Sequence, residues 1–250
     1  MSKQSDEGIE DVYAAVSAGR PVREHGPFEI QIGDQAMRFV PVVVDDPVVT
    51  GSQILAAACA RPASDFLVFQ VLRDGALETV RPDETVDLRS AGAEKFLVFR
   101  SDRSYRFFLD ERAFDWGATR ISGSTIKRLA EVPSATTDVW LDAPAGGEDR
   151  LIEDKEMVDL SSAGTERFIT RPVSITIKVN SRDRVVDRRQ LSYWEVVKLA
   201  YPEAGPSEQI IYSIDYASGP RQNPNGSLVE GQSVIVKEGM KFYVTPTDKS

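Results

Sequence analysis

The stretch Val158-Asp159-Leu160-Ser161-Ser162-Ala163-Gly164-Thr165-Glu166-Arg167-Phe168 decides the fold of this chain, because it has a close copy 72 residues earlier. In that copy, Val86-Asp87-Leu88 precedes Gly92-Ala93-Glu94-Lys95-Phe96. A looser third copy joins Val234-Ile235-Val236 to Gly239-Met240-Lys241-Phe242, and its phenylalanine lies 74 residues beyond Phe168. Because two anchors recur with the spacing between them nearly preserved, the chain is a tandem array.

The length of the repeat indicates what each unit is. Solenoid and propeller repeats usually run roughly 20–50 residues, because one such unit cannot bury its apolar face alone. A unit of 72 to 74 residues is large enough to close a small core. We therefore expect three separate small domains, at residues 28–101, 104–172 and 173–250, after a flexible N-terminal segment at 1–27 that contains a short helix.

The order of expected elements is the same in each unit. Each begins with alternating apolar residues, at 28–32, 107–109 and 175–179, and this pattern is typical of a half-buried strand. A polar turn and a second extended segment predict a hairpin. A helix comes next, with a hydroxyl N-cap and a terminating proline at matching places: Thr50, Ser122 and Ser192, then Pro62, Pro133 and Pro202.

Further extended segments close each unit, as at 66–71, 78–80 and 96–99 in the first. The element order is therefore β-β-α-β-β-β. A single helix packed on one face of a mixed sheet is an α+β arrangement. This order is the β-grasp plan.

Composition limits the function without naming it. The net charge of −9 argues against a nucleic-acid partner, and no apolar run approaches the ~20 residues that span a bilayer. The single cysteine, Cys59, and the polar N-terminus predict a cytoplasmic protein, and Cys59 itself is expected to be a small buried thiol on a helix. Basic residues gather in the last unit, where they predict a solvated face or a site for an acidic partner: Arg182, Arg184, Arg188 and Arg189.

The catalytic inventory of the sequence is nearly empty. His25 and Cys59 are the only histidine and the only cysteine, and they lie in differently structured segments. A Cys/His nucleophile pair and a His- or Cys-based metal site are therefore not expected. No glycine-rich phosphate loop appears either. The sequence predicts a protein that is not an enzyme and that binds no cofactor or metal.

The N-terminal segment carries an amphipathic stripe. Ile9, Val12, Tyr13 and Val16 follow helical spacing, and Gly19 and Pro21 lie just after them. This segment is a helix that docks onto a partner, a short helix that folds back onto the first unit, or a frayed tail. The sequence leaves these three alternatives open.

Unit size, element order and four strings resemble the bacterial multiubiquitin family, over about residues 28–250: Thr50-Gly51-Ser52-Gln53-Ile54-Leu55, Phe66-Leu67-Val68-Phe69, Thr85-Val86-Asp87-Leu88 and Gly164-Thr165-Glu166-Arg167-Phe168. The resemblance implies three ubiquitin-like β-grasp domains. It also implies an activating enzyme, a conjugating enzyme and a JAB-type peptidase as partners, in a conjugation system that serves antiviral defence.

The same resemblance nominates two kinds of site. Ubiquitin-like domains usually bind partners through apolar residues on their third and fifth strands, so Phe99 and Trp140 are candidates for a docking surface. A ubiquitin-like modifier is activated through a flexible C-terminal tail ending in glycine. Here the candidate conjugation tail has no glycine and reads Thr247, Asp248, Lys249 and Ser250.

Two functions of different class therefore compete. The resemblance favours a ubiquitin-like modifier or modifier precursor. The missing glycine favours a non-conjugated adaptor or scaffold, whose repeated surfaces bind with avidity. Self-assembly through sheet edges is a third alternative.

Overall fold

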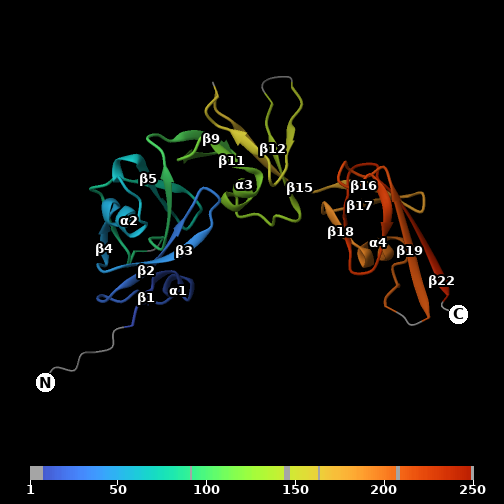
Figure 1. The fold of residues 1–250 in the computed structure, drawn as a ribbon, viewed down its shortest axis with the longest axis horizontal. Coiled ribbons are helices and arrows are strands. Elements are labelled where there is room, and N and C mark those ends of the chain that lie inside the picture. Colours follow the sequence, from blue (N-terminus) through green and yellow to red (C-terminus); the bar gives the residue numbers. More distant parts are fainter. Residues whose placement is uncertain (1–7, 91, 144–146, 163, 207–208, 249–250) are drawn as a thin grey trace. The chain divides into compact units, whose positions relative to one another are not determined.

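A computed structural model describes residues 8–90, 92–143, 147–162, 164–206 and 209–248. Three main sheets follow one another along the sequence, and each lies against a helix of its own (Figure 1). The chain divides into two compact units, Met1–Val132 with Val139–Thr170, and Pro133–Asp138 with Arg171–Ser250. The first of these compact units takes in the first repeat and most of the second, and the other contains the third repeat.

The first repeat opens with a hairpin and closes with the strand of the Gly-x-Glu-Lys-Phe motif. Its elements are β2 (Phe28–Gly33), β3 (Phe39–Val44), β4 (Val48–Thr50), α2 (Gly51–Ala57), a 3-10 turn (Ala63–Asp65), β5 (Phe66–Val71), β6 (Leu77–Val80), β7 (Thr85–Asp87) and β8 (Lys95–Arg100).

The second and third repeats reproduce this order. The second contains β9 (Tyr105–Leu109), β10 (Arg112–Trp116), β11 (Arg120–Ser122), α3 (Gly123–Leu129), β12 (Thr137–Leu141), β13 (Arg150–Ile152), β14 (Met157–Asp159) and β15 (Arg167–Pro172). The third contains β16 (Ile175–Val179), β17 (Arg182–Val186), β18 (Gln190–Ser192), α4 (Tyr193–Ala200), β19 (Ile210–Ala217), β20 (Asn225–Leu228), β21 (Ser233–Ile235) and β22 (Lys241–Asp248).

Each main sheet places the first and last strands of its repeat side by side and parallel. The strand order is β10-β9-β15-β12-β13 in the second repeat and β17-β16-β22-β19-β20 in the third, and β3-β2-β8-β5-β6 follows the same path in the first. The parallel pair joins Ile32 to Phe96, Leu109 to Phe168 and Val179 to Phe242. The chain is an α+β protein built from three tandem β-grasp domains.

The recurring Val-Asp-Leu motif has a structural role that the sequence did not show. Three short strands before the helices, β4, β11 and β18, pair with β7, β14 and β21. Val86 of the motif pairs with Val49, Val158 with Ile121, and Val234 with Leu191. The motif therefore pairs the short strand before each helix with the segment that leads into the last strand of the same repeat.

The expected N-caps are present in the helices of the three repeats, α2, α3 and α4. The hydroxyls of Thr50, Ser122 and Ser192 each accept a hydrogen bond from the amide three residues later, which satisfies one of the free donors of the first turn. Gly51 and Gly123 follow the first two caps because a Cβ there would lie 2.2 Å and 2.4 Å from backbone carbonyl oxygens. This close approach explains why the glycine recurs at this place.

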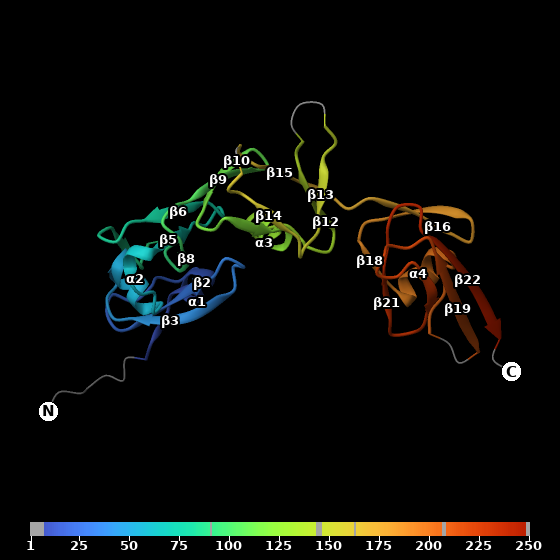
Figure 2. The same cartoon turned by 45° about the horizontal axis from the view of Figure 1, so that its top comes forward.

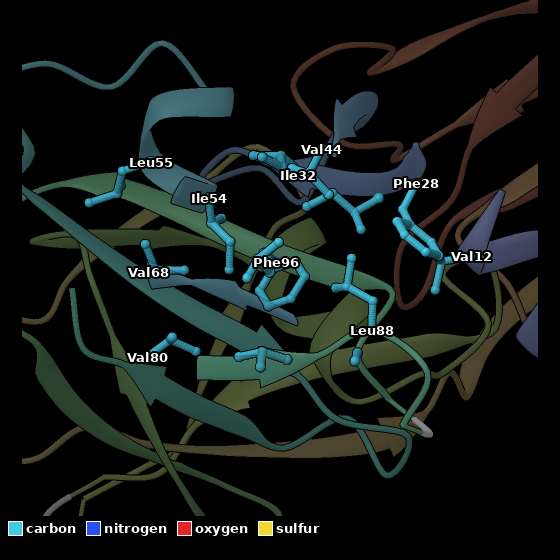
Figure 3. Close-up of a cluster of buried hydrophobic side chains, with 14 of the residues drawn as sticks. Val12, Phe28, Ile32, Val44, Ile54, Leu55, Val68, Val80, Leu88 and Phe96 are labelled. Carbon is cyan, nitrogen blue, oxygen red and sulfur yellow. The ribbon is translucent and has the colours of Figure 1, made fainter. Parts of the chain in front are cut away.

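The interior of the first repeat is a continuous apolar cluster (Figure 3). Phe28, Ile30 and Ile32 project inward from β2 at alternate positions, as the period of two predicts. They meet residues from the helix, from the later strands of the sheet and from the position just after β7: Ile54, Leu55, Val68, Val80, Phe96 and Leu88.

The N-terminal segment is part of this repeat from residue 9 onward. Strand β1 (Glu10–Asp11) pairs in parallel with β2, and α1 (Val12–Ser17) lies beside it (Figure 2). Val12 and Ala15 are fully buried in the core of the repeat. The short helix thus folds back onto the first unit, and the flexible segment expected over 1–27 does not extend to these residues.

A buried ion pair fixes this segment. Glu10 is 2% exposed, and its carboxylate accepts hydrogen bonds of 2.5 Å from both Arg20 and Arg23. Burial alone raises the pKa of Glu10, but the hydrogen bonds from Arg23 and Arg20 outweigh it and hold the pKa below its ordinary value. The turn after α1 is therefore tied electrostatically to β1.

Candidate docking faces and the carboxyl-terminal strand

Every repeat has a sheet face that points away from its helix, and we call it the outer face. In the first repeat this face is apolar and buried. Phe69 of β5 and Leu97 of β8 are fully buried, and Phe99 of β8 is 3% exposed. None of the three belongs to the core of the first repeat, because all three pack into the core cluster of the second.

An aromatic contact lies at the centre of this junction. The ring of Phe99 lies 4.7 Å from the ring of Trp116 and 5.6 Å from the ring of Phe69, edge to face in both cases. Gly117 follows Trp116, and a Cβ at this glycine would lie 2.5 Å from the Phe99 ring. The second repeat therefore approaches the first so closely that no side chain fits at 117.

Polar contacts border the apolar junction. Arg112 of β10 donates to the backbone oxygen of Asp74 and forms an ion pair of 3.3 Å with its carboxylate. Arg128 of α3 donates to the backbone oxygen of Ala36. A hydrophobic centre with a polar rim is the usual anatomy of a specific protein interface.

Phe99 was expected to lie on an exposed docking surface, but the structure buries it. Phe99 lies on the outer face and on the last strand, as expected, but the second repeat covers it. In this arrangement its ring is not available to a separate partner. The residues next to Phe99 in the sequence, Val98 and Arg100, gave no sign of this, because the burial comes from another repeat.

The second repeat presents a half-buried apolar outer face. Trp140 of β12 lies opposite Leu151 of β13, so both side chains point to the same face. Ile169 of β15 and Phe108 of β9 alternate with buried core residues and share that face. The structure therefore places the second predicted docking residue, Trp140, on a face of the expected kind.

The third repeat is more polar at the same place. Tyr243 of β22 occupies the position of Ile169 and of Leu97, and it is 50% exposed. Its cross-strand partner is Asp215 of β19, where the first repeat has Phe69. The three outer faces thus differ in chemistry, although the backbone beneath them is the same.

Strand β22 ends within the candidate conjugation tail, so only the first two residues of the tail belong to the sheet. Thr247 and Asp248 belong to β22 and pair with Ile211 and Ile210 of β19. These two pairs extend the antiparallel β19–β22 pairing beyond the pair of Tyr212 with Pro246. That pair corresponds to the last pair of β5 with β8 in the first repeat, Phe66 with Arg100. Lys249 and Ser250 lie outside the described residues.

A side chain in the first hairpin holds this last strand. Asn180 accepts from the amide of Val244 at 2.8 Å and donates to its carbonyl oxygen at 2.9 Å. Asp110 holds Thr170 in the second repeat in a similar way, accepting from both its amide and its hydroxyl. The Asn180 contact fixes β22 three residues before the candidate tail.

Residues that bear reactive chemistry are scattered. His25 is exposed in the N-terminal segment. Cys59 is exposed just after α2, at a φ of 55°, and not buried on a helix as its alanine neighbours suggest. Among the described residues, no group of three or more His, Cys, Asp or Glu side chains is arranged to hold a metal ion. Within the same residues, no helix is long and apolar enough to cross a membrane.

The fold and these outer faces define the class of protein. A hairpin, one capped helix and a parallel pairing of first and last strands, repeated three times, make the chain a tandem ubiquitin-like protein. A family model described as multiubiquitin matches residues 39–101, 105–173 and 175–248. The chain belongs to the multiubiquitin family. A search of curated proteins found none that matches it.

Proposed function

We propose that this protein is a ubiquitin-like modifier, or the precursor of one, in a bacterial conjugation system. Membership of the multiubiquitin family is the observation that carries the proposal. Its partners are an activating enzyme, a conjugating enzyme and a JAB-type peptidase, and the pathway is cytoplasmic. These enzymes recognise the repeats by their surfaces, because the chain supplies binding and not catalysis.

The third repeat supports this proposal through the direction of its last strand. β22 ends at the edge of the sheet where the tail of a ubiquitin-like modifier leaves the domain, and Tyr243 is exposed on the outer face of this strand. The two pairs that hold Thr247 and Asp248 must open before these residues enter an activating site. Activation of this chain therefore begins with the release of the end of β22.

The same pairing favours a second function. A chain whose last strand stays in the sheet through Asp248 is suited to a non-conjugated adaptor, in which the three repeats act only as binding surfaces. The adaptor and the modifier have the same fold and the same outer faces. They differ in the chemistry of the C-terminal carboxylate.

Mass spectrometry of the full chain separates the two functions. The protein is incubated with ATP and with the activating and conjugating enzymes, and intact and peptide masses are measured. A thioester or an isopeptide bond at the C-terminal end, or after an upstream residue exposed by trimming, establishes the modifier. An unchanged mass, with enzymes that are active on another substrate, establishes the adaptor.

One variant tests whether release of β22 limits activation. Ile211→Pro disrupts the ladder opposite Thr247, because proline is poorly tolerated inside a sheet. We expect faster thioester formation with this variant than with Ile211→Thr, which keeps a strand-forming residue. Equal rates would show that the paired tail does not limit the reaction.

A further inference from the structure

An open groove lies on the third repeat between its edge strand and its helix. The groove has a volume of about 520 Å³ and runs between β17 and α4. Val186, Leu191 and Leu199 give it an apolar floor. Val185 lines it as well and is 68% exposed, more than any other large hydrophobic residue in the described part of the chain. An apolar groove with an exposed valine on an edge strand is suited to binding.

The backbone beside this groove has unused hydrogen-bonding groups. β17 is the outermost strand of its sheet and pairs only with β16 among the described strands. The hairpin between them turns on Asn180 and Ser181, with φ of 48° and 67°, as in a two-residue type I′ turn. Such a turn makes Val179 and Arg182 a hydrogen-bonded pair.

Alternation then fixes which groups face outward. Residues 182, 184 and 186 direct their amides and carbonyls to β16, whereas Asp183 and Val185 direct theirs to the free edge. The opposite strand agrees with this register: Lys178 donates to Met240, and Thr176 accepts from Gly239, so both face β22 and not β17. Two successive outward positions on β17 can therefore pair with another strand.

Two basic side chains at or near the groove are available to a partner. Lys198 lines the groove and Arg182 begins β17; both are exposed, and neither has an ion-pair partner among the described residues. Of the acidic neighbours, Asp183 is paired with Lys178, at 2.6 Å. Arg188 pairs with both Asp187 and Glu195. On a chain of net charge −9, this basic edge complements an acidic partner.

The corresponding edges of the other repeats lack this combination. In the second repeat, Trp116 takes the place of Val186 and is buried against the first repeat. In the first repeat, Pro41 lies opposite Gln31, whose amide donates to Glu94, so Pro41 directs its ring nitrogen to the free edge. A proline has no amide hydrogen to donate there, so it disfavours the addition of another strand at this edge.

We propose that the third repeat binds an extended peptide of alternating aliphatic residues with acidic flanks. The peptide adds a strand to β17 through Asp183 and Val185. Its aliphatic side chains enter the groove beside α4, and its acidic residues meet Arg182 and Lys198. Main-chain pairing supplies affinity and the groove supplies specificity, as in other cases of strand addition. The proposal goes beyond conjugation, because it holds for a modifier and for an adaptor alike.

The test uses the full chain and one defined probe. The probe is a fluorescent peptide with valine or isoleucine at every second position and glutamates at both ends, and its control has one central residue replaced by proline. Binding is followed by fluorescence anisotropy, and the site is located by amide chemical shifts. We expect the largest shift changes at Asp183 and Val185, and affinity that falls as salt screens the acidic flanks.

Matched variants decide the location. Val185→Asp adds a negative charge to the edge and should weaken binding roughly tenfold or more, as loss of an interface anchor does. Val43→Asp makes the same change on β3 of the first repeat, where Val43 is 43% exposed, and should leave binding unchanged. Lys198→Glu should weaken binding and reduce its salt dependence. Thermal unfolding of each variant checks that the fold is retained.

Three results would overturn the proposal. The first is no saturable binding at peptide concentrations up to about 1 mM. The second is binding that Val185→Asp and Val43→Asp affect equally. The third is concentration-dependent self-association, seen by sedimentation and abolished by Val185→Asp, which would assign the groove to a second copy of the chain.

Discussion

The ring of Phe99 lies 4.7 Å from the ring of Trp116, at 69° to it, and this contact joins the first two repeats. The positions equivalent to Phe99 hold Arg171 and Thr245 in the later repeats. Only the first repeat therefore has an aromatic ring at this place. The three domains share a backbone, but their outer faces are specialised for different contacts.

The close approach at Gly117 gives a sharp test of this junction. Gly117→Ala places a Cβ about 2.5 Å from the Phe99 ring, so the repeats must separate. We expect a loss of about 1–3 kcal/mol in the free energy of unfolding, as for overpacked cores. Amide hydrogen exchange in β5 and β8 should rise. Gly205→Ala is the control, because nothing lies within 4 Å of its new Cβ. Equal effects of the two changes would contradict the junction.

Truncation of Phe99 should behave as a core substitution. Phe99→Ala removes a ring that is 3% exposed and leaves a cavity, at a cost of about 3–5 kcal/mol in stability. Tyr243→Ala on the third repeat should change stability by less than about 0.5 kcal/mol, because Tyr243 is 50% exposed. Urea unfolding measures both. If Phe99→Ala were as mild as Tyr243→Ala, Phe99 would be free to act as a docking residue.

The ion pair of Glu10 predicts a dependence of stability on pH. Its pKa is lowered in the folded state, so its stabilisation is present above the ordinary value of 4.5 and is lost as pH falls through the lowered value. Glu10→Gln should loosen β1 and α1 by about 1.5–3 kcal/mol at neutral pH, the range for hydrogen bonds to charged groups. Hydrogen exchange of the α1 amides measures this.

The control for Glu10 is a surface carboxylate. The side chain of Glu24 is 70% exposed and pairs with Arg89, so Glu24→Gln should have little effect. The difference between wild type and Glu10→Gln should also shrink at acid pH, because the wild-type carboxyl is then protonated. A difference that persists unchanged at low pH would rule out the ionic explanation.

Asn180 should control the order of the last strand. Asn180→Asp keeps the acceptor for the Val244 amide but removes the donor to its carbonyl oxygen, so two acceptors face each other. We expect a loss of about 1–3 kcal/mol and faster amide exchange along β22. Asn225→Asp makes the same substitution at an exposed position of β20 and is the control, which should leave exchange along β22 unchanged. Unchanged exchange in β22 would show that Asn180 does not hold the strand.

The repeat pattern and the N-caps were predictable because they depend on local chemistry. Alternation in β2, β9 and β16 and the hydroxyls of Thr50, Ser122 and Ser192 act within a few residues, and the structure confirms them. The short strands β4, β11 and β18 were missed because three residues carry too little periodicity. Their pairing depends on partners that lie far along the chain.

The candidate sites were only partly predictable. Phe99 and Trp140 were chosen by strand number alone, and a period of two cannot tell whether another repeat covers a face. Only one sequence feature pointed to the groove beside β17, the cluster of Arg182, Arg184, Arg188 and Arg189. The free edge at Asp183 and Val185 follows only from the register of the hairpin.

By itself, the sequence determined that this chain is three ubiquitin-like domains in a row, because two anchors per unit, one capped helix and alternating strands specify a fold through short-range order. Only the tertiary structure decided how those domains differ. The burial of Phe99 against Trp116, the seating of Val12 beside β2 and the pairing of Thr247 with Ile211 all join residues that are distant in sequence. Contacts of that kind depend on packing and register, and no local pattern encodes them.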